Sequence, residues 1–173
     1  LDIGTGYGET SIYLAKKHHN YKIFACEKYV DGNLNLIKNI KKENLDNISI
    51  HHGNVHEVLD SINTDKYFNS VYIFFPDPWP KKKHHKRRLI SDDFIKKIFH
   101  YIKSNGKLYI ATDSTSYLKD IFVSIYSNKS IFEWENQCYT YYSLKDYFNV
   151  ETKYYKKAIK SGIIPTFLVL KKL

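Results

Sequence analysis

Residues 1–18, LDIGTGYGETSIYLAKKH, decide the class of fold. Residues 1–3 are typical of the end of a strand, residues 4–8 predict a glycine-rich turn, and a helix is predicted from Glu9 to about His18. Glycines in such a turn let the backbone adopt positive φ and approach a ligand closely. This stretch is therefore the first strand–turn–helix unit of an α/β fold.

The same alternation continues along the chain. Further strands are predicted at 21–26, 48–52, 70–75, 107–111, 131–139 and 164–170. Helices are predicted at 30–42 and 55–62, after an N-cap at Ser91 with a stop at Asn105-Gly106, and around 117–125. Alternating strands and helices predict a mostly parallel sheet with helices on both faces. The last two strands, with no clear helix between them, predict an antiparallel addition at one edge.

The helix predicted at 30–42 has four apolar residues at helical spacing. One face of this helix carries Val30, Leu34, Ile37 and Ile40.

The chain begins inside a strand, so we expect a single domain over 1–173 that lacks an N-terminal segment, including any targeting signal.

Composition limits the class of protein. The chain has 173 residues, 43% of them hydrophobic and 26% charged, which suits a globular domain, and no apolar stretch is long enough to cross a bilayer. Its two cysteines, Cys26 and Cys138, form no CxxC pair, so no zinc ribbon or disulfide framework is indicated. The net charge of +9 favours a nucleic acid or another polyanion as partner.

The residues that suggest a catalytic site follow the fourth predicted strand. There, residues 76–80 (the proline loop) read PDPWP, and residues 81–88 (the basic run) are six Lys or Arg and two His. Proline fixes φ and disfavours helical conformations in the residue before it, so we expect Asp77 and Trp79 on a stiff, extended segment. A fixed carboxylate beside many cations is typical of a site that binds a polyanion and acts on it.

The glycine-rich turn indicates a nucleoside cofactor. Its spacing is G-x-G-x-G, whereas dinucleotide folds use G-x-G-x-x-G, and the acids Asp2 and Glu9 disfavour a pyrophosphate. A sulfonium cation with an amino acid tail suits these acids better. Glu27 ends the second strand, where an acid accepts hydrogen bonds from ribose hydroxyls, and Asn54 follows the third strand, where it can bond an adenine edge.

These residues follow different predicted strands. In parallel sheets, ligands bind beyond the carboxyl ends of the strands. We therefore expect the glycine turn, Glu27, Asn54, Asp77 and Asp113 to converge on one edge of the sheet.

The chain resembles the bacterial-type tRNA (guanine-N7)-methyltransferases. The resemblance rests on PDPWPKKKHHKRRL at 76–89, and is supported by DIGTGYGE at 2–9, Thr112-Asp113 and the segment 152–154. It implies a class I methyltransferase (Rossmann-like) fold, a seven-stranded, mostly parallel sheet with an antiparallel edge strand. It also implies S-adenosylmethionine as methyl donor and N7 of guanine 46 in the tRNA variable loop as target.

The resemblance also implies roles for individual residues. Asp77 corresponds to the presumed catalytic residue. The positions implied to contact the cofactor are Asp2, Gly4, Gly6, Gly8, Glu27, Asn54 and Asp77. The positions implied to bind substrate are Lys81, Asp113, Thr152, Lys153, Tyr154 and Tyr155. Two positions depart from the family pattern: Asn54 replaces an acid, and Tyr155 replaces a glutamate that would accept hydrogen bonds from the guanine edge.

We expect the basic run to hold tRNA phosphates. The predicted contacts are Lys82, Lys83, Lys86, Arg87 and Arg88. His84 and His85 have no third ligand at suitable spacing, so no metal site is expected. We expect the protein to be a monomer or homodimer that makes no contact with a membrane. Its expected location is the cytoplasm, and an organellar location is left open by the missing N-terminal segment.

Two alternative functions remain at this point. An exocyclic amino methyltransferase on RNA or DNA would carry a D-P-P-Y type loop, whereas this chain has Asp77-Pro78-Trp79-Pro80. A catalytically inactive tRNA-binding scaffold would not need the intact glycine turn and Glu27.

Overall fold

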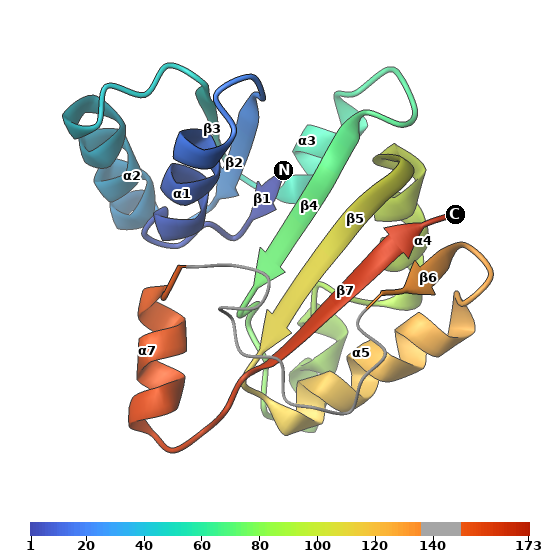
Figure 1. Cartoon of the computed structure of the whole chain (residues 1–173). Helices are drawn as coiled ribbons and strands as arrows, with labels where there is room; N and C mark the ends of the chain where they lie inside the picture. Colours follow the sequence, from blue (N-terminus) through green and yellow to red (C-terminus); the bar gives the residue numbers. More distant parts are fainter. Residues whose placement is uncertain (136–149) are drawn as a thin grey trace. The chain divides into compact units, whose positions relative to one another are not determined.

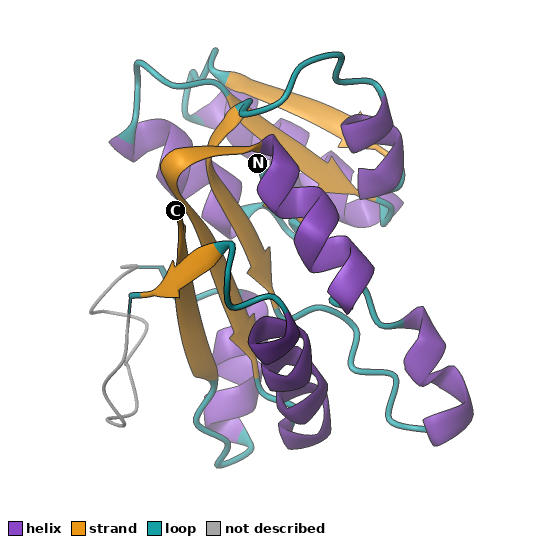
Figure 2. Ribbon diagram, turned by 90° about the vertical axis from the view of Figure 1, so that its right-hand side faces the viewer, coloured by secondary structure: helices purple, strands orange, loops and turns teal. Residues whose placement is uncertain are grey.

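The computed structural model describes residues 1–135 and 150–173, which form two compact units (Figure 1). The first unit comprises the described residues of Leu1–Asn63 and Leu144–Lys153, and the second those of Thr64–Ser143 and Tyr154–Leu173. Seven strands, mostly parallel, lie in the described residues, and Figure 2 shows helices packed against the strands of each unit. The predicted α/β fold class is confirmed.

The first unit contains three parallel strands. Its elements are β1 (Asp2–Ile3), α1 (Glu9–Lys17), β2 (Ile23–Glu27), α2 (Val30–Lys42), β3 (Ile48–His52) and α3 (Val55–Asp60). Strand β2 pairs in parallel with β1 on one side and with β3 on the other. The carboxyl ends of all three strands therefore lie at one edge of this unit.

Helix α2 packs through a different face from the one that its apolar residues predict. Val30 and Leu34 are each more than 50% exposed, whereas Gly32 and Leu36 are buried. A Cβ on Gly32 would lie 2.2 Å from the carbonyl oxygen of Gly6, so α2 approaches the glycine turn too closely for any larger side chain. This close approach, which no helical period reveals, decides the buried face.

The second unit combines two parallel strands with an antiparallel pair. Its elements are β4 (Phe68–Phe74), the 3₁₀ helix η1 (Lys82–Arg87), α4 (Asp92–Tyr101), β5 (Ile102–Thr112), α5 (Thr115–Ser127), β6 (Phe132–Trp134), α7 (Lys153–Lys160, whose first residue falls in the first unit) and β7 (Thr166–Lys172). Within this unit the strand order is β4-β5-β7-β6; β4 and β5 are parallel, and β7 is antiparallel to both neighbours. The predicted antiparallel addition is confirmed, with β6 outside β7.

Helix α4 begins where the sequence predicts and ends earlier. The Ser91 hydroxyl accepts a hydrogen bond from the Phe94 amide at 3.3 Å, which is the predicted N-cap. The predicted stop at Asn105-Gly106 is wrong, because Ile102 already belongs to β5. Those two residues instead lie in an irregularity of β5, where the pairing with β4 shifts register and Asn105 has φ 63°.

Two of the helices in the described residues were not predicted. The basic run folds as η1, and α7 lies between the last two strands, where no clear helix was expected. Ala158 is the buried residue of α7, and Tyr154, Tyr155 and Ile159 lie beside it at helical spacing, so the apolar side of this helix is only about two turns long. Among the described helices, none is both long enough and apolar enough to span a membrane.

Candidate active site

The glycine turn of the first unit has the conformation that its composition predicts. Gly4, Gly6 and Gly8 have φ of 70°, 56° and 87°. A Cβ on Gly8 would lie 2.7 Å from the Leu36 side chain, so Gly8 is required for the packing of α2 against the turn. A Cβ on Gly4 would meet no atom within 4 Å, which leaves open space beside that backbone for a ligand.

Glu27 is held beside this turn. Its Oε2 accepts a hydrogen bond from the Gly6 amide at 2.8 Å, and its Oε1 accepts one from the Tyr29 amide at 2.8 Å. Each carboxylate oxygen has a second lone pair, so Glu27 can still accept hydrogen bonds from two hydroxyl groups. The structure thus places two of the predicted cofactor residues, Glu27 and Gly6, in direct contact.

Asp2 lies under the turn rather than on its surface. It is 2% exposed, and its Oδ2 accepts a hydrogen bond from the Ser11 hydroxyl at 2.6 Å. Burial raises the pKa of Asp2 to about 6, although the Ser11 hydrogen bond opposes this shift. Through Ser11 the carboxyl group ties β1 to α1, and this position suits support of the turn.

Asn54, which follows β3, makes a hydrogen bond within the protein. Its Oδ1 accepts a hydrogen bond from the His56 amide at 3.1 Å and so caps α3. The same oxygen is the atom that would bond an adenine amino group. One lone pair remains for that contact, and the cap fixes the direction in which the oxygen points.

Tyr7 and Tyr29, which the sequence analysis did not select, lie at the glycine turn. The ammonium group of Lys153 lies 3.9 Å from the centroid of the Tyr7 ring, and the Lys153 amide donates to Glu9 Oε1 at 3.1 Å. Contact with Lys153 lowers the pKa of the Tyr7 hydroxyl. The Tyr7 ring also meets Tyr29 edge-on, with centroids 6.2 Å apart. The position of Tyr7 within G-x-G-x-G was the one sequence signal for that residue, and no sequence pattern pointed to Tyr29.

In the second unit, the proline loop turns sharply at both ends. Phe75 and Trp79, which each precede a proline, have φ of 54° and 44°. The prediction of an extended segment is therefore wrong at Trp79. Positive φ in bulky residues is costly and clusters at functional sites, where the surrounding structure holds it in place. Between these two turns, the side chain of Asp77 is presented to solvent.

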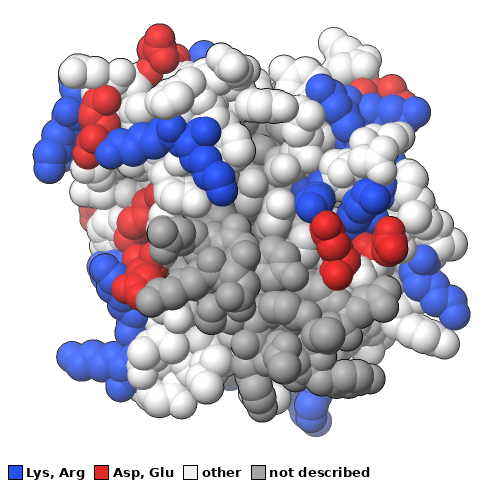
Figure 3. All heavy atoms as spheres, viewed as in Figure 1, with Lys and Arg blue, Asp and Glu red and all other residues white. Residues whose placement is uncertain are grey.

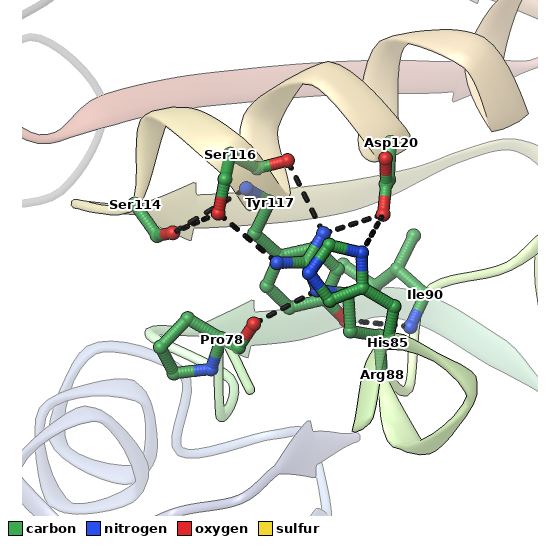
Figure 4. A network of polar contacts seen from close by, with 8 residues as sticks. All are labelled: Pro78, His85, Arg88, Ile90, Ser114, Ser116, Tyr117 and Asp120. Atoms are coloured by element: carbon green, nitrogen blue, oxygen red, sulfur yellow. Dashed lines mark hydrogen bonds and ion pairs between the residues drawn. The ribbon is translucent and has the colours of Figure 1, made fainter. Parts of the chain in front are cut away.

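Arg88 holds the loop from inside the protein (Figure 4). Its Nε donates to the Pro78 carbonyl at 2.8 Å, and its two Nη atoms donate to the Ser116 carbonyl and hydroxyl and to Asp120 Oδ2. The guanidinium also lies 4.9 Å from the centroid of the Tyr117 ring. The side chain is 3% exposed. The predicted phosphate contact of Arg88 is therefore wrong: four of its five N–H donors bond within the protein, its side chain is buried, and it ties the proline loop to α5.

Tyr117 extends this network to the chain that follows the basic run. Its hydroxyl accepts a hydrogen bond from the Ile90 amide at 2.8 Å, and burial raises the pKa of Tyr117 to about 12. The hydroxyl therefore stays protonated at neutral pH. Together, Arg88 and Tyr117 fix the chain that follows η1 relative to α5.

The remaining cations of the basic run face solvent. Lys81, Lys82, Lys83, Lys86 and Arg87 are exposed. The Arg87 guanidinium lies 4.9 Å from the centroid of the Trp79 ring, and the His84 ring meets Trp79 edge-on. Trp79 is thus a platform that orders the basic run, and these cations are free of the interior contacts that occupy Arg88.

Asp113 lies at the same edge of the second unit as Asp77. Each follows the carboxyl end of one of two paired parallel strands, β5 and β4, and the Phe75 amide donates to the Ala111 carbonyl at 2.8 Å. Within this unit the predicted convergence of the two acids is confirmed. The glycine turn, Glu27 and Asn54 likewise share one edge of the first unit, and convergence of the two groups stays a prediction.

The predicted substrate segment 152–155 is divided between two environments. Thr152 is buried and Lys153 is at the glycine turn. In the second unit, the Tyr154 ring stacks on Phe75 with centroids 6.4 Å apart, and the Tyr155 ring tilts against Phe167 at 6.4 Å. Tyr155, at the position of the family glutamate, therefore packs its ring on β7.

Comparison with known proteins gives a consistent result. The family model Methyltransf_4, described as "Putative methyltransferase", matches residues 1–164. The chain is 32% identical over 173 residues to a tRNA (guanine-N(7)-)-methyltransferase of Neisseria meningitidis serogroup C, covering 100% of this chain and 71% of the relative. It is 40% identical over 117 residues to the protein of the same name from Nitrosomonas eutropha, covering 68% of this chain and 52% of the relative. The chain thus spans about half the length of several of these relatives.

Solved structures share the fold at low sequence identity. An rRNA methylase from Streptococcus thermophilus aligns with a TM-score of 0.64 and 14% identity, covering 99% of this chain and 84% of that one. The tRNA (m1A58) methyltransferase TrmI from Aquifex aeolicus aligns with a TM-score of 0.60 and 12% identity, covering 99% and 61%. At these identities the likeness shows the class I methyltransferase fold.

Proposed function

The chain belongs to the tRNA (guanine-N7)-methyltransferase family, and we propose that it methylates N7 of guanine 46 in tRNA with S-adenosylmethionine as methyl donor. The observation that carries the proposal is the similarity to a relative of that name along all 173 residues. That similarity includes both the glycine turn and the proline loop, which are the parts that the reaction needs.

The residues of the first unit fit the cofactor. Gly4 leaves open space beside the turn, and Glu27 keeps lone pairs for ribose hydroxyls while two amides hold it in place. The Asn54 oxygen keeps one lone pair for the adenine amino group. When bound, S-adenosylmethionine supplies an electrophilic methyl group on a sulfonium sulfur. Asp2 would support the turn through Ser11, which replaces the direct contact implied by the resemblance.

The residues of the second unit suit a purine that becomes positively charged. Guanine N7 carries a lone pair and no proton, so its methylation requires no general base. The protein must orient the base and exclude water, and positioning of this kind supplies roughly 7–11 kcal/mol of a barrier. We assign to Asp77 the stabilisation of positive charge that develops on the purine, and to Asp113 a role in holding the base.

The exposed cations suit the polynucleotide. Lys82, Lys83, Lys86 and Arg87 would contact tRNA phosphates, which position the RNA without reading its sequence. Lys81 and the segment 152–155 remain the proposed substrate contacts near the reacting base. The ring of Tyr155 packs on Phe167, so a bond from its hydroxyl to guanine is the part of this assignment that most needs a test.

We propose that the two units act together as one methyltransferase domain, as a monomer or homodimer in the cytoplasm. The family model supports the single domain, because residues 1–164 extend through both units.

The decisive experiment uses the complete protein, unmodified tRNA and labelled S-adenosylmethionine, with the product mapped by borohydride–aniline cleavage. We expect cleavage at a single guanine of the variable loop. Label on an exocyclic amine would favour the alternative class of methyltransferase, and absence of cofactor binding in calorimetry would favour an inactive tRNA-binding scaffold.

The role of Asp77 has a separate test. Asp77→Asn should lower the turnover number about 100-fold, the scale of losing one group that stabilises transition-state charge, while calorimetry shows cofactor binding retained. Asp93→Asn, which changes an exposed acid in α4, is the matched control. An unchanged turnover number in Asp77→Asn, with cofactor bound, would exclude the assigned role.

A further inference from the structure

Helix α7 carries four lysines on one face. Lys153, Lys156, Lys157 and Lys160 have the spacing i, i+3, i+4 and i+7, and all four are exposed. Ala158, on another side of the helix, is buried. We call Lys156, Lys157 and Lys160 the lysine stripe, and leave Lys153 aside because it contacts Tyr7.

The stripe has no acidic partner within its own helix. The eight residues of α7, KYYKKAIK, include no Asp or Glu. Lysines three and four residues apart repel one another, and a helix this short is marginal on its own. In Figure 3, drawn in the view of Figure 1, Lys or Arg side chains project at the lower left, where α7 lies. A repulsive stripe of this kind is favoured when a polyanion lies against it.

The body of α7 is packed beside the proline loop. The Tyr154 ring stacks on Phe75, directly before the loop, and the Tyr155 ring packs against Phe167 of β7. At the other end of the loop, Trp79 contacts Arg87 of η1. Both ends of the loop that carries Asp77 are thus joined to a helix rich in exposed cations.

We propose that the lysine stripe of α7 is a second phosphate-binding surface for the substrate RNA, in addition to the basic run. The inference rests on the proposed function for the identity of the polyanion. From Lys156 to Lys160 the helix rises about 6 Å. Duplex nucleic acid carries one charge per about 1.7 Å of its axis, so the stripe spans several phosphates. Such contacts strengthen binding and leave the chemical step unchanged.

The test is the salt dependence of tRNA binding. In the complete protein, Lys156→Gln, Lys157→Gln and Lys160→Gln are combined, and the Kd for unmodified tRNA is measured between 50 and 300 mM salt. We expect the slope of log Kd against log salt to fall by about 2 to 3, from the value of about 0.9 per phosphate on duplex DNA. The KM for tRNA should rise, while the turnover number at saturating tRNA stays the same.

A matched triple variant controls for net charge. Lys38, Lys41 and Lys42 are exposed lysines on α2 that span four residues, as the stripe on α7 does, and their replacement by Gln removes the same number of charges. A slope for the α7 variant equal to that of the unaltered protein, or equal to that of the α2 variant, would overturn the inference. Gln and Lys have similar helix propensities, so both variants should fold, which circular dichroism checks.

The two proposals fail in different ways. If the α7 variant binds tRNA as the unaltered protein does, and guanine N7 is still methylated, then the proposal of a second phosphate-binding surface is wrong and the proposed activity stands. If the unaltered protein transfers no methyl group to N7 but the slope falls in the α7 variant alone, then the RNA surface stands and the activity does not.

Discussion

Replacement of Arg88 by methionine tests whether this residue belongs to the interior or to the RNA surface. Methionine keeps much of the length and apolar contact of the arginine stem and removes the guanidinium. The guanidinium donates four hydrogen bonds, two of them to the carbonyl oxygens of Pro78 and Ser116. Its loss leaves those carbonyls without this donor, whereas Asp120 is 47% exposed in its side chain and can turn to water.

The expected cost follows from these contacts. An unsatisfied buried polar group costs about 1–3 kcal/mol, and the Asp120 ion pair adds at most about 1 kcal/mol because solvent screens it. We therefore expect Arg88→Met to lower the free energy of unfolding by about 3 kcal/mol, taking each of the two part-buried carbonyl contacts at about 1.5 kcal/mol, in the lower half of that range. For a chain of this length, that corresponds to a fall in Tm of about 6–12 °C.

The assay is denaturant and thermal unfolding of Arg88→Met beside Arg87→Met. Arg87 is the matched control, since it is exposed and its cation–π contact with Trp79 is worth about 0.5–1 kcal/mol. We expect Arg87→Met to weaken tRNA binding with little loss of stability, and Arg88→Met to show the reverse order of effects. Equal stability of the two variants, with a larger salt-slope change for Arg88→Met, would refute the burial argument and restore Arg88 as a phosphate contact.

Two further predictions concern the glycine turn. Glu27→Gln should weaken S-adenosylmethionine binding about 10- to 100-fold in calorimetry. The Glu27 carboxylate accepts charge-assisted hydrogen bonds from the Gly6 and Tyr29 amides and would accept others from the ribose. An unchanged Kd would contradict this role. Burial raises the pKa of Asp2 from 3.8 to about 6, so the folded state binds this proton more tightly, and the stability it contributes is present below pH 3.8 and lost as the pH rises through 6. Relative to the unaltered protein, Asp2→Asn should therefore gain up to about 3 kcal/mol in free energy of unfolding between pH 4 and pH 7, and a difference that is constant with pH would show that Asp2 titrates normally.

Local patterns accounted for the features that depend on near neighbours. Positive φ in the glycine turn, the Ser91 cap and the acid at the end of β2 were all predicted, because each depends on residue type within a few positions of the chain. The alternation of strands and helices predicted the fold class for the same reason. Helix α7 was missed because it is eight residues long, and its apolar side is too short to show a helical period clearly.

Only the tertiary structure decided which of several similar residues does what. Arg87 and Arg88 are adjacent and chemically identical, yet one stacks on Trp79 in solvent and the other is buried against α5. Helix α2 turns Gly32 inward in place of its larger apolar residues, because the Gly6 carbonyl leaves no room for a Cβ. Both outcomes depend on segments distant along the chain, whose approach sets burial and hydrogen-bond partners, and no period in the sequence records that approach.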